Sequence, residues 1–178
     1  TTRNYGYDGL NRLTLATTPG ATTLDERFTY DGTGDRQSKQ IGATGMVLPY
    51  VYPNNSHRLA SMSGQPRSYD AAGNLTAVGT PGSGFDYVYD DRGRMTDVKF
   101  AGVVQRSYKY NVRGERVSKI YAGAPTSNLV FDYDEAGHLL GEYSTAGVAV
   151  AEYVWMDDTL VGIIKVDNGS TFQYVETD

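Results

Sequence analysis

A five-residue motif, Tyr-Asp-x-x-Gly, recurs along the whole chain. Its clearest copies begin at Tyr7, Tyr69, Tyr89 and Tyr133, looser copies begin at Tyr30, Tyr52 and Tyr110, and two degenerate copies begin at Trp155 and Tyr174. The nine anchors follow one another at steps of 17–23 residues. A tandem period of about 21 residues is typical of solenoids, propellers and hairpin arrays, in which each unit buries its apolar face against its neighbours. The repeat therefore predicts an array rather than a globule built around one core.

Each copy of the motif predicts a tight turn between two antiparallel strands. An aspartate at the start of such a turn hydrogen-bonds the backbone two residues on, and a glycine three residues later supplies a positive φ. Apolar and polar residues alternate before the turn, as in residues 85–89, and again after it. No window has a sustained apolar stripe of helical period, so we expect almost no helix and an all-β fold of tandem antiparallel β-hairpins. We assign structural turn roles to Tyr7, Asp8, Tyr30, Asp31, Tyr69, Asp70, Gly73, Tyr89, Asp90, Gly93, Tyr110, Gly114, Tyr133, Asp134 and Gly137.

Composition narrows the function classes. The net charge is −5 and the 16 basic residues are scattered, which argues against nucleic acid as the main partner. The chain has no cysteine, which excludes disulfides and thiolate metal sites. No apolar run of about 18 residues is present, so we expect no membrane span. We expect residues 1–178 to form a single array of hairpin units that is a fragment of a longer array, with no cofactor and no metal.

Three segments depart from the regular repeat. Pro53 replaces the turn aspartate, and the shortest step, 17 residues, follows, so we expect one short or bulged strand pair there. Clusters of Gly, Pro, Ser and Thr at residues 17–23, 42–45, 79–84 and 123–128 predict loops at a second edge, away from the Tyr-Asp turns. Residues 172–178 predict one more incoming strand, whose open edge favours edge-to-edge self-association of the fragment.

The motif and its spacing resemble the YD repeat of the RHS (rearrangement hotspot) family. The segments 153–161 and 174–178 resemble the closing repeats of an RHS core, just before its terminal motif. This resemblance implies a curved, spiralling sheet that forms part of a shell around a variable C-terminal toxin domain. Such shells occur in bacterial polymorphic toxins, including type VI secretion effectors and Tc insecticidal complexes. The family's self-cleavage motif has no counterpart in this sequence, so no catalytic residue carries over from the resemblance.

No residue pattern predicts catalysis. His57 and His138 are the two histidines, and we interpret both as solvated turn positions, because the place of His138 is taken by Asn74, Arg94 or Glu115 in other copies. The adjacent carboxylates at 90–91, 134–135 and 157–158 do not predict a glycosidase pair, since neighbouring residues in a strand point to opposite faces. The short Gly-x-Gly segments at 32–34 and 82–84 lack the Lys-Ser/Thr and the helix of a phosphate loop.

Two functions remain open at this stage. The first is a structural, non-enzymatic segment of an RHS shell, with the remainder of the parent core and its C-terminal toxin as partners. The second is a secreted or cell-surface module that binds carbohydrate through its tyrosines, of which there are 15. Wall-binding repeats of similar period are usually rich in tryptophan, whereas this chain has one, Trp155. Both functions place the chain in the secreted or cell-surface fraction of a bacterium.

Overall fold

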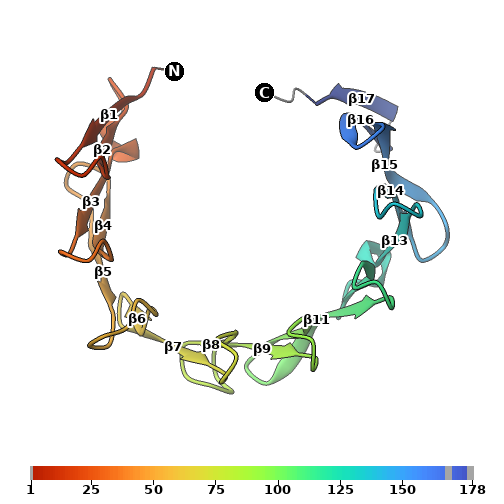
Figure 1. The fold of residues 1–178 in the computed structure, drawn as a ribbon, viewed down its shortest axis with the longest axis horizontal. Helices are drawn as coiled ribbons and strands as arrows, with labels where there is room; N and C mark the ends of the chain where they lie inside the picture. Colours follow the sequence, from red (N-terminus) through yellow and green to blue (C-terminus); the bar gives the residue numbers. More distant parts are fainter. Residues whose placement is uncertain (1, 167–169, 176–178) are drawn as a thin grey trace. The chain divides into compact units, whose positions relative to one another are not determined.

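The computed structural model describes residues 2–166 and 170–175. In these residues the chain is all-β, with 17 strands and two short 3-10 turns (Figure 1). The all-β hairpin fold expected from the repeat is therefore confirmed. None of the described helical segments is long or apolar enough to cross a lipid bilayer. The chain divides into two compact units, Thr1–Pro81 and Gly82–Asp178.

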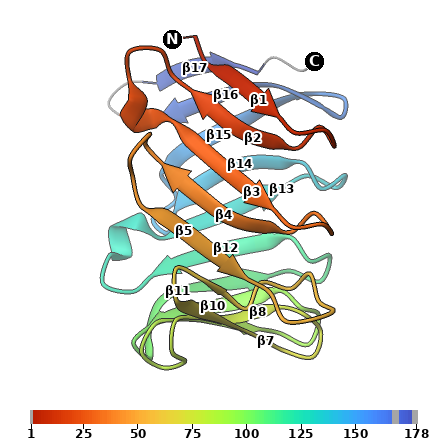
Figure 2. The ribbon, with the colours of Figure 1, turned by 90° about the vertical axis from the view of Figure 1, so that its left-hand side faces the viewer.

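The first unit is a meander in which each strand pairs antiparallel with the next. Its elements are β1 (Asn4–Tyr7), β2 (Leu13–Thr17), η1 (Thr22–Leu24), β3 (Glu26–Tyr30), β4 (Arg36–Ile41), β5 (Val47–Val51), β6 (Ser61–Met62), β7 (Gln65–Tyr69) and β8 (Leu75–Val78). In Figure 2, the Tyr-Asp turns of the β1–β2 and β3–β4 hairpins lie at one edge of this unit, and the loop that contains η1 lies at the other. The two edges predicted from the loop composition are thus present in this unit.

The second unit is also an antiparallel meander. Its elements are β9 (Phe85–Tyr89), β10 (Met95–Phe100), β11 (Val103–Tyr110), β12 (Arg116–Tyr121), η2 (Pro125–Ser127), β13 (Leu129–Tyr133), β14 (Leu139–Ser144), β15 (Ala149–Met156), β16 (Thr159–Val166) and β17 (Ser170–Tyr174). The incoming strand predicted at the end of the chain is β17. The remainder of that prediction, residues 176–178, lies outside the described residues.

Two of the irregular copies form turns of a different kind. Around Tyr52 the chain makes a wide loop, because β5 ends at Val51 and β6 begins only at Ser61. The shortest step in the repeat therefore produces β6, a strand of two residues, which confirms the predicted short pair. After Trp155 the turn has only two residues, since Met156 lies opposite Thr159. These two copies keep the aromatic anchor of the motif but not its five-residue turn.

Neither unit has a conventional hydrophobic core. Among the described residues, the buried hydrophobic side chains are Ala16, Phe28, Ala77, Phe131 and Ala151, and no large side chain is fully buried. A single layer of strands leaves both faces in contact with solvent, so most apolar residues are only half-buried. The hairpins are held to one another by strand pairing between adjacent repeats and by side-chain contacts, several of which lie at the Tyr-Asp turns.

Candidate functional site: the ladder of Tyr-Asp turns

The turn that begins at Asp90 shows how the motif folds. The amide of Asp90 donates to the carbonyl of Arg94 (2.9 Å), and the amide of Gly93 donates to the carbonyl of Asp90 (2.9 Å). The Oδ1 atom of Asp90 accepts from the amides of Arg92 and Arg94, both at 3.0 Å. Gly93 has a φ of +73°, in the left-handed region that a glycine enters at little cost. A tight turn followed by a left-handed residue is a common connection for a β-hairpin.

The same turn recurs in both units. The first residue accepts from the amide of the fifth residue at 2.8–3.0 Å in the turns that begin at Asp8, Asp31, Asp70, Asp90, Asn111 and Asp134. The fourth residue has positive φ in every one of them: Asn11 (58°), Gly34 (98°), Gly73 (92°), Gly93 (73°), Gly114 (92°) and Gly137 (95°). Asn11 replaces glycine in the first turn, as asparagine tolerates the left-handed region better than most residues. The backbone conformation of the turn therefore explains why the sequence motif recurs.

In five of these six turns the fifth residue also closes the turn through its side chain, whereas Asp35, the fifth residue of the turn at Asp31, contacts His57 instead. Arg12 donates from Nε to Oδ2 of Asp8 (2.7 Å), and Arg94 does the same to Asp90 (2.8 Å). Asn74 binds Asp70, and His138 binds Asp134, at 2.9 and 2.8 Å. In one turn the polarity is inverted, since Nδ2 of Asn111 at the first position donates to Oε2 of Glu115 at the fifth. Either end can supply the acceptor, provided that the other supplies the donor.

Five aromatic anchors each bind the backbone of the preceding hairpin within their own unit. The hydroxyl of Tyr110 donates to the carbonyl of Met95 at 2.8 Å. The other such bonds run from Tyr30 to Leu13 (2.8 Å), Tyr69 to Leu59 (2.8 Å), Tyr133 to Arg116 (3.1 Å) and Nε1 of Trp155 to Leu139 (2.8 Å). The acceptor lies just after the preceding turn each time. This rung fixes the spacing of neighbouring hairpins.

A cation or an imidazole from the preceding hairpin covers the anchor ring in four of these pairs. The guanidinium of Arg12 lies 4.8 Å from the ring centre of Tyr30, and that of Arg94 lies 4.8 Å from Tyr110. Arg58 covers Tyr69 at 5.1 Å, and the imidazole of His138 is stacked on Trp155 at 4.5 Å. Cation–π contacts of this kind contribute roughly 0.5–1 kcal/mol at exposed sites and more when they are shielded. Sequence reasoning missed these contacts, although Arg12, Arg94 and His138 share the fifth position of their turns.

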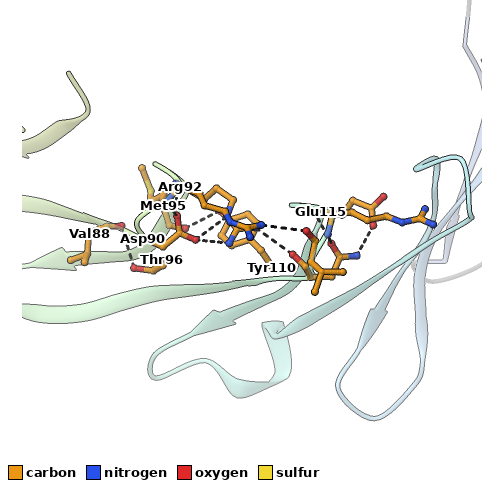
Figure 3. Close-up of polar contacts among 11 residues, drawn as sticks. Val88, Asp90, Arg92, Met95, Thr96, Tyr110 and Glu115 are labelled. Carbon is orange, nitrogen blue, oxygen red and sulfur yellow. Dashed lines mark hydrogen bonds and ion pairs between the residues drawn. The ribbon is translucent and has the colours of Figure 1, made fainter. Parts of the chain in front are cut away.

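Side chains of one turn also reach the next turn. Nη1 of Arg12 donates to the carbonyl of Asp31 (2.9 Å), and Nη1 of Arg94 donates to that of Asn111 (3.3 Å). Arg92 and Arg113 make equivalent bonds to the carbonyls of Val112 and Glu135. Figure 3 shows these contacts leading from Asp90 past Tyr110 to the turn that contains Glu115. We call this set of closures, rungs and turn-to-turn bonds the turn ladder.

Hydrogen bonds within the turns lower the pKa of each turn aspartate below its ordinary value. The strongest cause is the backbone N–H of the fifth residue for Asp8 and Asp134, and a side-chain donor (Thr33, Asn74 or Arg94) for Asp31, Asp70 and Asp90. The folded turns therefore favour the ionised carboxylate. In the second unit, burial and a hydrogen bond to Glu142 raise the pKa of Tyr153 to about 12.

The interpretation of both histidines as solvated turn positions is wrong for His138. Its side chain is only 18% exposed, because it lies against Trp155 and between two aspartates. Its ring nitrogens contact Oδ2 of Asp134 at 2.8 Å and Oδ1 of Asp158 at 3.1 Å. His57 is 72% exposed, and only its Nδ1 contacts a carboxylate, Oδ2 of Asp35 at 2.8 Å. The error arose because the neighbouring hairpin, which covers His138, is 20 residues away in the sequence.

Basic residues are also interleaved with aromatic rings along the strands. The guanidinium of Arg36 lies between Phe28 (5.0 Å) and Tyr50 (5.6 Å), and its Nε is buried without a hydrogen-bond partner. Arg116 lies in the same way between Tyr108 (5.6 Å) and Phe131 (4.7 Å). Each of these arginines is the first residue of the strand that follows a turn. One guanidinium group in each unit thus packs between aromatic rings, next to the buried Phe28 or Phe131.

The described residues include shallow hollows between neighbouring turns. A hollow of about 330 Å³ lies between the turns at residues 111–115 and 131–135, and one of about 400 Å³ between those at 90–94 and 110–112. Within residues 2–166 and 170–175, no group of three or more His, Asp or Glu is placed to hold a metal ion. Of the adjacent carboxylates 90–91, Asp90 is engaged by its own turn and Asp91 is exposed.

Comparison with known proteins identifies the repeat. The family model described as "RHS Repeat" matches residues 69–102, which run from the Tyr69 anchor through the turn at Asp90. The resemblance to the RHS family predicted from the motif is thereby confirmed. No curated protein matches the sequence.

Much longer solved chains contain segments similar in structure to this chain. The crystal structure of TcdB2-TccC3-TEV matches with a TM-score of 0.52 and 12% identity, over 97% of this chain and 11% of that one. A structure of the Photorhabdus luminescens Tc holotoxin pore matches with a TM-score of 0.44 and 15% identity, over 92% of this chain and 10% of that one. The chain thus spans about a tenth of the length of these solved chains. At 12% identity the first match establishes a shared fold.

Proposed function

We propose that this chain is a structural, non-enzymatic segment of an RHS-repeat shell that encloses the C-terminal toxin of a bacterial polymorphic toxin or secretion-system effector. Its partners are the remainder of the parent RHS core and that toxin, and its location is secreted or at the cell surface. The RHS repeat at residues 69–102 supports the assignment. The fold shared with TcdB2-TccC3-TEV supports it as well, since the sequence resemblance already pointed to Tc complexes.

The turn ladder is the observation that carries this proposal. A wall around a cargo needs a sheet whose order does not depend on a core of its own, because both of its faces must stay available. Here the hairpins are joined by bonds between adjacent repeats, as the rung from Tyr110 to Met95 and the cover of Tyr110 by Arg94 illustrate. Contacts of this nearest-neighbour kind allow an array of any length to be built. That property suits a shell assembled from many copies.

Carbohydrate binding, the second function considered, draws less support from the structure. A sugar stacks on an open aromatic face, whereas ring faces of Tyr30, Tyr69 and Tyr110 are covered by arginine. The largely exposed tyrosines are Tyr5, Tyr7 and Tyr174, at 55, 60 and 84%, and they do not form a regular series. A glycan screen of the purified chain with no saturable binder would remove this function.

The test of the shell proposal uses the full-length product of the parent gene. The purified protein is treated with protease under native and denaturing conditions, and peptides from any segment downstream of residue 178 are followed by mass spectrometry. We expect a downstream segment that resists protease until the protein is denatured, even where it has been cut from the core. A downstream segment digested at the same rate in both conditions, or no folded segment at all, would contradict the proposal.

A matched pair of variants links that protection to the turn ladder. Tyr110→Phe removes the rung to Met95 but keeps the ring, whereas Tyr7→Phe removes a hydroxyl that is bonded to no described residue. In the full-length protein we expect faster digestion of the downstream segment for Tyr110→Phe than for Tyr7→Phe. Equal rates would show that the ladder does not hold the wall closed.

A further inference from the structure

Three fifth-position residues build the same joint between neighbouring hairpins. Arg12 and Arg94 each bind the carboxylate of their own turn, cover the next anchor ring and donate to the next turn. His138 does all three: it binds Asp134, stacks on Trp155 and contacts Asp158 in the β15–β16 turn. Arginine is charged at every accessible pH, whereas histidine gains and loses its proton near neutrality. One joint of this design is therefore made with a titratable group.

The geometry around His138 requires the protonated ring. Both ring nitrogens face a carboxylate oxygen, Nδ1 that of Asp134 at 2.8 Å and Nε2 that of Asp158 at 3.1 Å. A neutral imidazole has one N–H and one lone pair, so it donates to only one of two carboxylates and turns its lone pair toward the other. Only the imidazolium has an N–H for each. The two contacts together thus exist only below the pKa of His138.

The charged groups around this joint come from three elements. Asp134 belongs to the same turn as His138, and Asp158 belongs to the β15–β16 turn. On the preceding turn, Oε1 of Glu115 lies 3.2 Å from the place where a Cβ on Gly137 would stand, and Arg113 donates to the backbone carbonyl of Glu135. The only cation in this group, Arg113, is engaged by a backbone carbonyl, so the ring faces a predominantly negative environment.

We propose that His138 is a pH-dependent clasp that joins the β13–β14 hairpin to the β15–β16 hairpin when its ring is protonated and releases Asp158 when it is not. Asp158 is the partner that leaves, because its contact is the longer one and its side chain is 96% exposed. The contact to Asp134 remains, since a neutral ring still donates one hydrogen bond within its own turn. The clasp is a property of the RHS-repeat scaffold beyond the proposed shell function, and it does not depend on the presence of a toxin.

The direction of the pH dependence follows from the opposite pKa shifts of His138 and Asp134. Hydrogen bonding to Asp134 raises the pKa of His138 above its ordinary value, whereas hydrogen bonding lowers that of Asp134. The stabilisation is fully present below the unfolded pKa of histidine, about 6.5, and is lost as the pH rises through the raised value. It is also lost in acid, where Asp134 takes up a proton. The joint is tightest between these two limits.

The chain contains its own reporter for this test. Trp155 is the only tryptophan, and a protonated imidazole stacked on an indole quenches its fluorescence. Trp155 fluorescence is recorded from about pH 5 to pH 9 in the unaltered chain, alongside NMR titration of the two histidine rings. The variants are His138→Arg, Asp158→Asn and, as the matched control, His57→Gln. His138→Arg places at this joint the residue that Arg12 and Arg94 supply elsewhere.

We expect a fluorescence midpoint above 6.5 that coincides with the NMR titration of His138 and is unchanged in His57→Gln. Asp158→Asn should lower the midpoint, and His138→Arg should abolish the transition while the chain stays folded by circular dichroism. Hydrogen exchange of the β14–β15 amides, corrected for its intrinsic pH dependence, should rise above the midpoint by at most roughly tenfold per pH unit, since one proton is involved. A midpoint at or below 6.5, an equal midpoint in Asp158→Asn, or a transition that persists in His138→Arg would overturn the proposal.

Discussion

The contribution of an anchor tyrosine's hydrogen bond to stability can be measured by removing its hydroxyl oxygen. Tyr30→Phe keeps the ring, which lies under Arg12 at 4.8 Å, and removes the O–H that donates to the carbonyl of Leu13 at 2.8 Å. The net contribution of such a hydrogen bond is about 1 kcal/mol, and the half-buried carbonyl regains part of its loss from water. We therefore expect a loss of about 1 kcal/mol, which increases the opening of the two neighbouring hairpins about fivefold.

The chain supplies a control at the equivalent position of the first repeat. Tyr7 anchors its own turn, but its side chain is 60% exposed and its hydroxyl makes no hydrogen bond to any described residue. Tyr7→Phe removes the same atom in the same unit and should leave stability within about 0.5 kcal/mol, as surface substitutions usually do. Native-state hydrogen exchange of amides in β2 and β3, read by mass spectrometry, reports both changes. A Tyr30→Phe effect no larger than that of Tyr7→Phe would refute the rung as a stabilising element.

Three further predictions concern the turns themselves. Gly34→Ala should destabilise the first unit by ~1–2 kcal/mol in urea unfolding because of the φ of +98°, whereas Gly32→Ala in the same turn should be close to neutral. Asn111→Asp should set two carboxylates against each other and lower the melting temperature, and adding Glu115→Arg should restore it by recreating the ordinary polarity of the turn. The pKa values of the turn aspartates, such as Asp90, are depressed, so stability present above about pH 3.9 is lost as the pH falls through them. Circular dichroism melting curves between about pH 5 and pH 3 should therefore shift to lower temperature, and an unchanged melting temperature would contradict this cause.

The hairpins were predictable because their determinants are local. An aspartate that accepts from the amide of its fifth residue and a fourth residue with positive φ both act within five residues, as in the turn from Asp90 to Arg94. The same reasoning correctly predicted a short strand after Pro53, where β6 has two residues. It did not predict that the Tyr52 and Trp155 copies have other turns. In those copies the turn residues are absent, and only the aromatic anchor keeps its place.

The contacts between neighbouring hairpins could not be predicted by considering each repeat alone. His138 has an aspartate in its own turn like other fifth-position residues, but its exposure is set by Trp155 and Asp158, 17 and 20 residues further on. The cation–π contacts of Arg12 and Arg94 were missed for the same reason, because the aromatic ring that each one covers belongs to the next repeat. Comparing the turns of Arg12, Arg94 and His138 with the anchors that follow them would have revealed the pairing of a basic residue with an aromatic ring.

The variation at the fifth position follows from what the next hairpin offers. Arg12 and Arg94 face a backbone carbonyl and an aromatic ring, and a long cation can satisfy both. His138 faces a carboxylate and an indole, which a protonated flat ring matches. Glu115 accepts a hydrogen bond within its own turn, from the side-chain amide of Asn111, which replaces the usual aspartate at the first position. Each joint is thus specified by residues about 20 positions apart, so the repeat can vary in charge and in pH response at one joint while the hairpins on either side keep the same backbone.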